Sequence, residues 1–376
     1  MRKCPAAVLL ILTLVLAFGG CGGKGGGPDA KLNADVARYA LPETIARYQD
    51  EVKARPTASS YDMLARALAS ARQPKPARQA LEKAVSLDPD YEPSALLLGR
   101  ALLQENKAPS TEQMMRSLLE KHPRSAEAAE LLCRALIRQN RASEAVPALD
   151  QALKINGKSS QLLWARADAR AIGKQYDEAE KDYHRAIKLA PRNVPLQMSY
   201  IKTLMLSGKK DEAAKAALET VKLAPDSADV HFMAASALHQ ADRVEEALNQ
   251  YKEALVINPS MVPAANNLAL VLADRKQDTG TAVSWARKAA LLAPRNIAVA
   301  DTLGWALARD GQYSDGVSIL RQVKKAWAQN LTVTYHLGWA LAHAGQRAEG
   351  VKLLEQTAVS SDASAADARK ALEELR

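Results

Sequence analysis

The stretch that decides the fold is Ala228–Met261, ADVHFMAASALHQADRVEEALNQYKEALVINPSM. Small and apolar residues recur in it at the three- and four-residue spacing that places them on one face of an α-helix. One such face runs through Ala235 and Leu238, and a second follows the break at Asp242. Pro259 ends the second helix, because proline has no amide hydrogen to donate and collides with the preceding turn. The stretch therefore predicts a pair of short amphipathic helices.

This pair recurs along the chain with a period of 34 residues. Helix-breaking residues precede Pro259 at that interval, at Pro225, Pro191, Gly157, Pro123 and Pro89. An alanine near the start of the second helix follows the same interval, at Ala145, Ala179, Ala213 and Ala247, and after one inserted residue at Ala282. A fixed period of this length indicates an array in which each unit buries its apolar face only against its neighbours.

The pattern resembles the tetratricopeptide repeat (TPR), a helix–turn–helix unit of 34 residues. The resemblance covers residues 58–364, about nine copies. It implies an all-α fold, a TPR α-solenoid wound as a right-handed superhelix. The first helices of the nine copies are expected to begin near Ala58, Glu92, Ala126, Ser160, Val194, Ala228, Val262, Ile297 and Leu331.

The segments on either side of the repeats are expected to cap the array, since a terminal unit must present a polar outer face. Capping helices are predicted within residues 34–57, and a last capping helix within residues 365–376. No Gly/Ser-rich linker interrupts residues 58–376, which predicts a single domain.

The solenoid follows an N-terminal segment, residues 1–20, with the features of a signal peptide. Arg2 and Lys3 precede an apolar run over Val8–Phe18 that is too short to span a bilayer. Two glycines and Cys21 come next, an ending that resembles the lipobox of bacterial lipoproteins. That resemblance implies cleavage before Cys21 and attachment of lipid to its thiol. An ordinary signal peptide with a chance cysteine is the alternative.

The residues after the cysteine bear on localisation. Gly22 stands where enterobacterial lipoproteins of the inner membrane carry an aspartate, so the resemblance implies the periplasmic side of the outer membrane. Residues 21–33, which comprise the lipidated cysteine and a glycine-rich segment, are expected to form a flexible tether. Membrane contact is then expected through the lipid alone.

Composition and motifs argue against several function classes. The formal net charge is +9, but the basic residues are dispersed and lack the interleaved aromatics expected for nucleic-acid binding. No GxxxxGK[ST], HExxH or CxxC motif is present, and the six histidines are scattered. Cys133 takes a small-residue position of its repeat and is assigned to packing. The sequence therefore predicts no enzyme activity, no cofactor and no metal.

In TPR solenoids the first helix of each pair lines a concave surface that binds ligands. The outward positions of these helices define the expected groove: Arg66, Arg100, Arg134, Arg138, Trp164, Met198, Lys202, Phe232, Met233, Asn267, Trp305, Tyr335, His336, Trp339 and His343. Its aromatic and methionine side chains suit a peptide, and its basic amino-terminal part suits an acidic segment. Trp305 and Trp339 could instead fill space between adjacent repeats, and the sequence leaves both roles open.

These features predict a non-catalytic scaffold, lipid-anchored in the cell envelope, that binds a peptide or protein segment in its groove. Asn266-Asn267-Leu268-Ala269 and Ala300–Trp305 resemble the TPR lipoproteins that accompany PEP-CTERM exopolysaccharide and sorting systems. The resemblance implies a partner in exopolysaccharide or envelope assembly, or in protein export. A TPR lipoprotein of type IV pilus biogenesis and a glycan-binding periplasmic solenoid are the alternatives.

Overall fold

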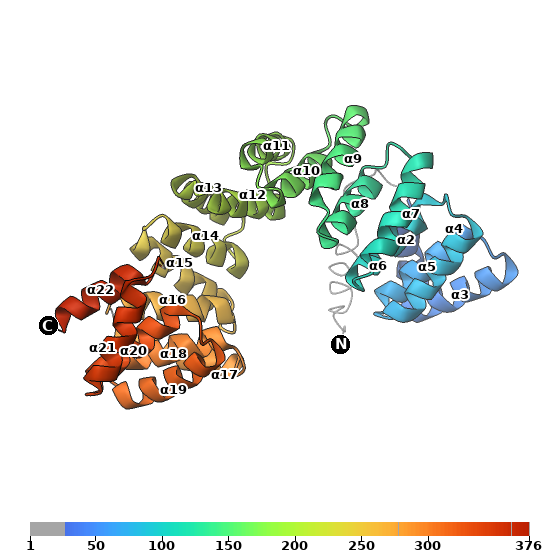
Figure 1. The fold of residues 1–376 in the computed structure, drawn as a ribbon. Coiled ribbons are helices and arrows are strands. Elements are labelled where there is room, and N and C mark those ends of the chain that lie inside the picture. The colour runs from blue at the N-terminus through green and yellow to red at the C-terminus, as the bar shows by residue number, and fades with distance from the viewer. Residues whose placement is uncertain (1–26, 277, 362, 376) are drawn as a thin grey trace. The chain divides into compact units, whose positions relative to one another are not determined.

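The computed structural model of the protein describes residues 27–276, 278–361 and 363–375. Within these ranges every regular element is an α-helix (Figure 1). The predicted all-α TPR solenoid is therefore confirmed as the fold class. None of the described helices combines the length and the apolar character needed to cross a bilayer.

Nine helix pairs make up most of the described chain, and we call the first helix of each pair helix A and the second helix B. The A helices are α4 (Ala58–Ser70), α6 (Glu92–Gln104), α8 (Ala126–Arg138), α10 (Ser160–Ile172), α12 (Val194–Leu206), α14 (Ala228–Gln240), α16 (Val262–Asp274), α18 (Ile297–Arg309) and α20 (Leu331–His343). The B helices are α5 (Pro74–Leu87), α7 (Ala108–Lys121), α9 (Ala142–Ile155), α11 (Tyr176–Leu189), α13 (Lys210–Leu223), α15 (Val244–Ile257), α17 (Thr279–Leu292), α19 (Tyr313–Ala326) and α21 (Arg347–Ala358). Every A helix begins at the residue expected from the repeat.

Further helices flank the nine pairs. Before them lie α2 (Pro28–Tyr39) and α3 (Leu41–Ala54), and after them lies α22 (Ala365–Glu374). The prediction of a flexible tether over residues 21–33 is wrong from Pro28 onwards, where α2 begins. Proline suits the first turn of a helix, and Leu32 is buried in the core of the first repeats, so this segment gains a packing partner that composition alone does not reveal.

The chain divides after Pro191 into two compact units. The first unit contains the helices up to α11, and the second contains α12 to α22. This differs from the single domain expected from the absence of a linker. In a solenoid each repeat contacts only its neighbours, so an uninterrupted chain can still separate into units.

Helices A and B of a pair approach each other so closely that only small side chains fit between them. In five B helices an alanine at the same position is fully buried: Ala145, Ala179, Ala213, Ala247 and Ala282. Glycine takes this place in the last two pairs. A Cβ atom on Gly316 would lie 2.8 Å from the carbonyl oxygen of Gly304, and one on Gly350 would lie 2.6 Å from that of Gly338. Alanine, the rule elsewhere, is therefore too large at these two positions.

The turn between helix A and helix B contains a residue with positive φ in all nine pairs. Gly208, Gly311 and Gly345 supply it in three pairs, whereas Lys174 and other non-glycine residues supply it elsewhere. In eight turns the next amide donates to the carbonyl oxygen five residues earlier, which is the bond that defines a Schellman motif. This hydrogen-bond pattern ends helix A at the same place in each of those repeats, with or without glycine.

We expect Gly350→Ala to lower the free energy of unfolding by about 1–3 kcal/mol, because the added methyl group collides with the backbone of α20. Urea denaturation followed by circular dichroism measures this change. Gly280→Ala in α17 is the matched control, since a Cβ atom there meets no other atom within 4 Å. Equal stability of the two variants would contradict the close approach of α20 and α21.

Candidate ligand-binding groove

Arg66 on α4 is held by carboxylates of the chain itself. Its Nε lies 2.7 Å from Oδ2 of Asp62, which is fully buried, and its guanidinium also pairs with Asp29 of α2. The second oxygen of Asp62 accepts a hydrogen bond from the Ser94 hydroxyl of α6 at 3.0 Å. Arg66 thus joins α2 to the first repeat and has only 13% of its side chain exposed.

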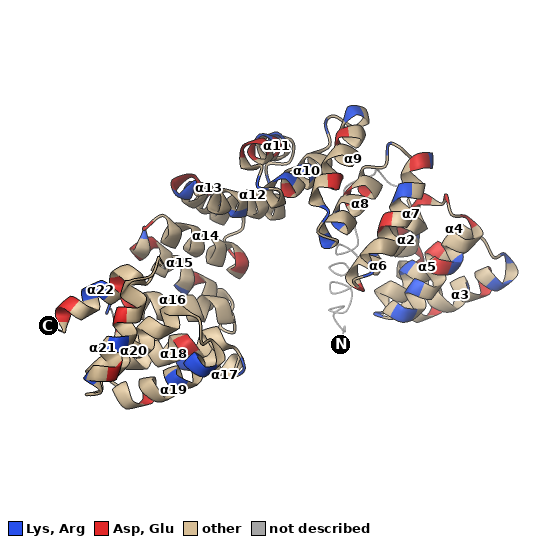
Figure 2. Cartoon of the chain, viewed as in Figure 1, with Lys and Arg blue, Asp and Glu red and all other residues tan. Residues whose placement is uncertain are grey.

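The other arginines expected in the groove are also engaged. Arg100 pairs with Glu127 at 2.5 Å, and Arg134 pairs with Glu130 at 3.1 Å. Arg138 donates to the carbonyl oxygen of Leu103 and, at 3.2 Å, to the side chain of Asn106. Figure 2 shows acidic and basic residues interspersed along the helices of this unit. The amino-terminal part predicted to be basic is thus largely neutralised, because carboxylates compensate Arg66, Arg100 and Arg134, whereas Arg138 donates to uncharged acceptors.

Trp164 on α10 is half-buried, and its indole nitrogen is fully buried. One turn further along α10 lies Asp168, whose carboxylate accepts a hydrogen bond from the Tyr183 hydroxyl. Burial raises the pKa of Asp168 above its usual value, and hydrogen bonds from Tyr183 and Trp164 offset only part of the effect. The surroundings of Trp164 are thus mainly desolvated.

Expected groove residues of the second unit remain accessible on α12 and α14. Met198, Phe232 and Met233 are half-buried, and Lys202 is exposed. Met198 and Phe232 occupy equivalent positions of adjacent A helices, and these two helices pack against each other. We call Met198, Phe232 and Met233 the inner apolar patch, and Lys202 lies at its edge.

Asn267 on α16 is tied to helix B of the preceding pair. Its amide Nδ2 donates to the Tyr251 hydroxyl at 3.3 Å, and the Tyr251 ring lies 6.1 Å from the ring of Phe232. Asn267 therefore positions Tyr251 beneath one member of the inner apolar patch, and it is not a free amide.

Trp305, His336 and Trp339 do not line an open groove, which corrects their assignment to it. They are exposed by only 1%, 4% and 4%, respectively. Trp305 stacks on His336 at 4.4 Å between ring centroids and meets the edge of Trp339 at 5.3 Å. Here helix α18 packs against the A helices before and after it, α16 and α20, and the rings fill the space between these helices.

Acidic side chains pair with two polar atoms of this aromatic cluster. The Trp305 indole donates to Asp274 at 2.6 Å, and Nδ1 of His336 lies 3.0 Å from Asp301. Burial raises the pKa of Asp274 against the opposing effect of the Trp305 hydrogen bond. These contacts make the cluster part of the core.

Tyr335 and His343 lie at the edge of this cluster. Tyr335 is half-buried with its ring 5.5 Å from that of Trp305, and burial raises its pKa. His343 is exposed and stacks on Trp339 at 3.8 Å. Only the outer rings of the predicted carboxyl-terminal groove are therefore accessible.

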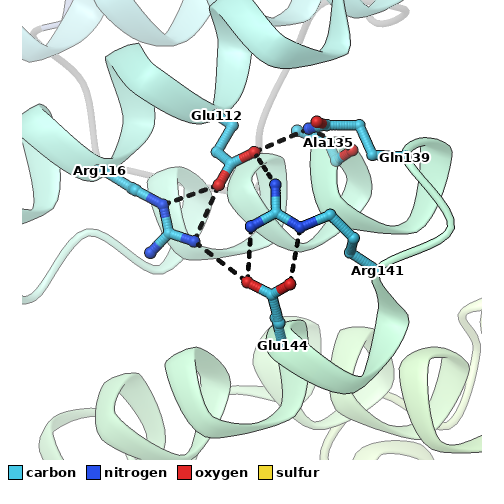
Figure 3. Close-up of polar contacts among 6 residues, drawn as sticks. All are labelled: Glu112, Arg116, Ala135, Gln139, Arg141 and Glu144. Atoms are coloured by element: carbon cyan, nitrogen blue, oxygen red, sulfur yellow. Dashed lines mark hydrogen bonds and ion pairs between the residues drawn. The ribbon is translucent and has the colours of Figure 1, made fainter.

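A network of ion pairs braces the second and third repeats (Figure 3). Glu112 of α7 accepts a hydrogen bond from Arg116 at 2.9 Å and one each from Arg141 and Gln139 at 2.8 Å. Arg141 also donates two hydrogen bonds to the carboxylate of Glu144. Burial opposes ionisation of Glu112, but these hydrogen bonds prevail and lower its pKa. The spacing of Glu112 and Arg116 is visible in the sequence, whereas the partnership with Arg141 depends on the fold.

Nothing in the described residues forms a metal site, since no group of three His, Cys, Asp or Glu side chains suited to a metal ion occurs there. Cys133 is buried, and burial raises the pKa of its thiol to about 12, so it has the character of an inert packing residue. Cys21, the predicted lipidation site, lies outside the described residues.

The repeated helix pairs define an α-solenoid of the tetratricopeptide type. Residues 58–91, 102–168 and 202–262 match models described as tetratricopeptide repeats, so TPRs are recognised in these parts of the chain. The TPR fold is typically a non-catalytic scaffold that binds peptides or proteins, and no catalytic family is indicated.

Several solved structures are similar to this chain, and the first of them supports the same fold. A tetratricopeptide repeat protein from Parabacteroides merdae is similar over 66% of this chain and 98% of its own, with 12% identity and a TM-score of 0.51. YrrB, described as a TPR protein with an unusual peptide-binding site, matches 49% of this chain and 95% of its own, with 17% identity and a TM-score of 0.41. MamA matches 46% of this chain and 97% of its own, with 22% identity and a TM-score of 0.41. Comparison with curated protein sequences gives no match.

We expect Trp305→Ala to lower the free energy of unfolding by about 3–5 kcal/mol, because it removes a buried ring and leaves Asp274 without its donor. Urea denaturation followed by circular dichroism measures the loss. Trp327→Ala is the control, because Trp327 is 36% exposed. If the Trp305 variant were as stable as the control, the ring would belong to a binding surface and not to the core.

Proposed function

We propose that this protein is a non-catalytic scaffold that binds a peptide or protein segment on the A helices of its second unit. The inner apolar patch supports the proposal, because Met198, Phe232 and Met233 stay partly exposed on adjacent helices that pack against each other. Methionine and phenylalanine provide large, adaptable contact surfaces for apolar anchors of a partner. Tetratricopeptide proteins bind partners in this manner.

The same patch indicates the character of the segment. Lys202 lies one helical turn after Met198 and is exposed, so it can pair with an acidic side chain next to an apolar anchor. A segment that carries an aromatic or aliphatic residue beside Asp or Glu therefore fits the patch best.

The double variant Met198→Ala/Phe232→Ala is expected to bind such a segment at least about tenfold more weakly, because both anchoring surfaces are lost. The probe is a fluorescein-labelled 15-residue peptide selected for binding to the unaltered protein from a displayed library, and fluorescence anisotropy measures its affinity.

Val256→Ala is the matched control, since Val256 is 74% exposed on α15, a B helix. Unchanged affinity of the double variant, with its helical signal intact, would place the binding surface elsewhere.

We also propose that the protein is anchored by lipid on Cys21 at the periplasmic face of the outer membrane and acts in exopolysaccharide or envelope assembly, or in protein export. The lipobox-like sequence before Cys21 and the resemblance to TPR lipoproteins of exopolysaccharide systems support this role. A scaffold of type IV pilus biogenesis is the alternative within the same class.

Cys21→Ser is expected to abolish incorporation of labelled palmitate and to move the exported protein from the membrane to the soluble fraction, because the thiol that carries the lipid is gone. Cys133→Ala is the control, since Cys133 is buried in the repeats. A Cys21→Ser protein that stays on the membrane after export would exclude this anchor.

Glycan binding is a second candidate, favoured by a polar concavity of about 910 Å³ in the second unit. It is lined by the rings of Tyr313 and His343, whose centroids lie 5.9 Å apart with 30° between the ring planes, together with Gln312, Gln322 and Gln346. Flat rings beside amides suit a sugar. Saturable binding to exopolysaccharide fragments that is lost in Tyr313→Ala, together with no selectable peptide, would reverse the order of the two functions.

A further inference from the structure

The first unit contains a cavity of about 370 Å³ that peptide binding at the inner apolar patch does not use. Its walls come from α2, α4, α5 and α6, and they are mostly aliphatic, with contributions from Leu32, Ala69, Leu81, Leu97 and Ala101. A volume of this size lies within the range of small-molecule sites in proteins.

Small side chains of α4 and α5 leave room for the cavity, among them Ala65, Ala69 and Ala77. At the position of Ala69 the next two A helices carry the larger Leu103 and Ile137. The N-terminal helix α2 adds a wall through Leu32 and Asp29, which partly encloses the space.

One cation at this cavity is available to a ligand. Arg66 is committed to Asp62 and Asp29, and Arg78 is committed to Glu82 at 3.0 Å and to Glu105 at 3.2 Å. Arg72 also lines the cavity, is exposed, and has no ion pair with any residue that the structure describes. The site therefore combines apolar walls with a single uncompensated positive charge.

This combination distinguishes between classes of ligand. A buried peptide brings an N–H and a C=O for each residue, and the aliphatic walls offer these groups no partners. A hydrocarbon chain has no such requirement, and a carboxylate at its end matches the guanidinium of Arg72. We propose that this cavity binds an aliphatic carboxylate, with its alkyl chain between α4, α5 and α6 and its carboxylate on Arg72.

Isothermal titration calorimetry of the purified full chain with dodecanoate, below its micelle-forming concentration, tests the proposal. Saturable binding is expected, and dodecanol should bind at least about tenfold more weakly because it lacks the charge. Arg72→Gln should reduce the affinity for dodecanoate to that for dodecanol and leave dodecanol binding unchanged. Arg55→Gln, an exposed arginine that does not line the cavity, is the control and should alter neither affinity.

Ala69→Phe tests the location, because the larger ring fills the cavity and should abolish binding of both probes without lowering the unfolding temperature. If that variant fails to fold, Ala69→Leu repeats the test with the side chain found at Leu103. The proposal is overturned if no saturable binding occurs, if dodecanol binds as tightly as dodecanoate, or if the filled variants still bind. None of these variants alters the inner apolar patch, so this result is independent of the peptide-binding test.

Discussion

The close approach of the two helices within each pair is the constraint on which the rest of the structure depends. Ala179 and Ala247 show it in ordinary repeats, where a methyl group is fully enclosed by the partner helix. Gly316 and Gly350 show its limit, since even a methyl group would collide there with the opposing backbone. Because each pair is stabilised only by itself and its neighbours, every copy must satisfy this condition separately.

The A helices use their inner positions differently along the chain. In the first unit they carry arginines neutralised by nearby carboxylates, as in the Arg66–Asp62 and Arg134–Glu130 pairs. On α12 and α14 the positions one turn earlier carry partly exposed Met198 and Phe232, whereas on α18 and α20 the positions equivalent to Arg66 carry the buried Trp305 and Trp339. One repeat geometry therefore provides ion-pair bracing, an accessible apolar surface and an aromatic core.

The sequence predicts the helices well because their determinants are local. Periodic small residues, a helix breaker such as Pro259 and a turn residue such as Gly208 all act within one repeat. The start of α2 at Pro28 escapes prediction, because the segment after a glycine-rich stretch becomes a helix by burying Leu32 against distant residues. The local sequence alone does not predict that contact.

The candidate site is predicted less well for the same reason. The sequence correctly predicts which residues share one face of each A helix. Whether the side chains on that face are exposed depends on the adjacent A helix. Trp305 is covered by α20, and Arg100 meets Glu127 of the next repeat, 27 positions along the chain. Met198 and Phe232 remain partly exposed because no neighbouring side chain covers them completely.

The paired arginines of the first unit have a consequence for the energetics of any acidic molecule that approaches them. Such a molecule must displace a resident carboxylate, such as Glu127 from Arg100, so one ion pair is exchanged for another. Few counterions are released in this exchange. The arginine is already partly desolvated in its ion pair within the folded protein, so binding adds little further desolvation cost. Association there would thus depend little on ionic strength, and discrimination between acidic molecules would rest on shape.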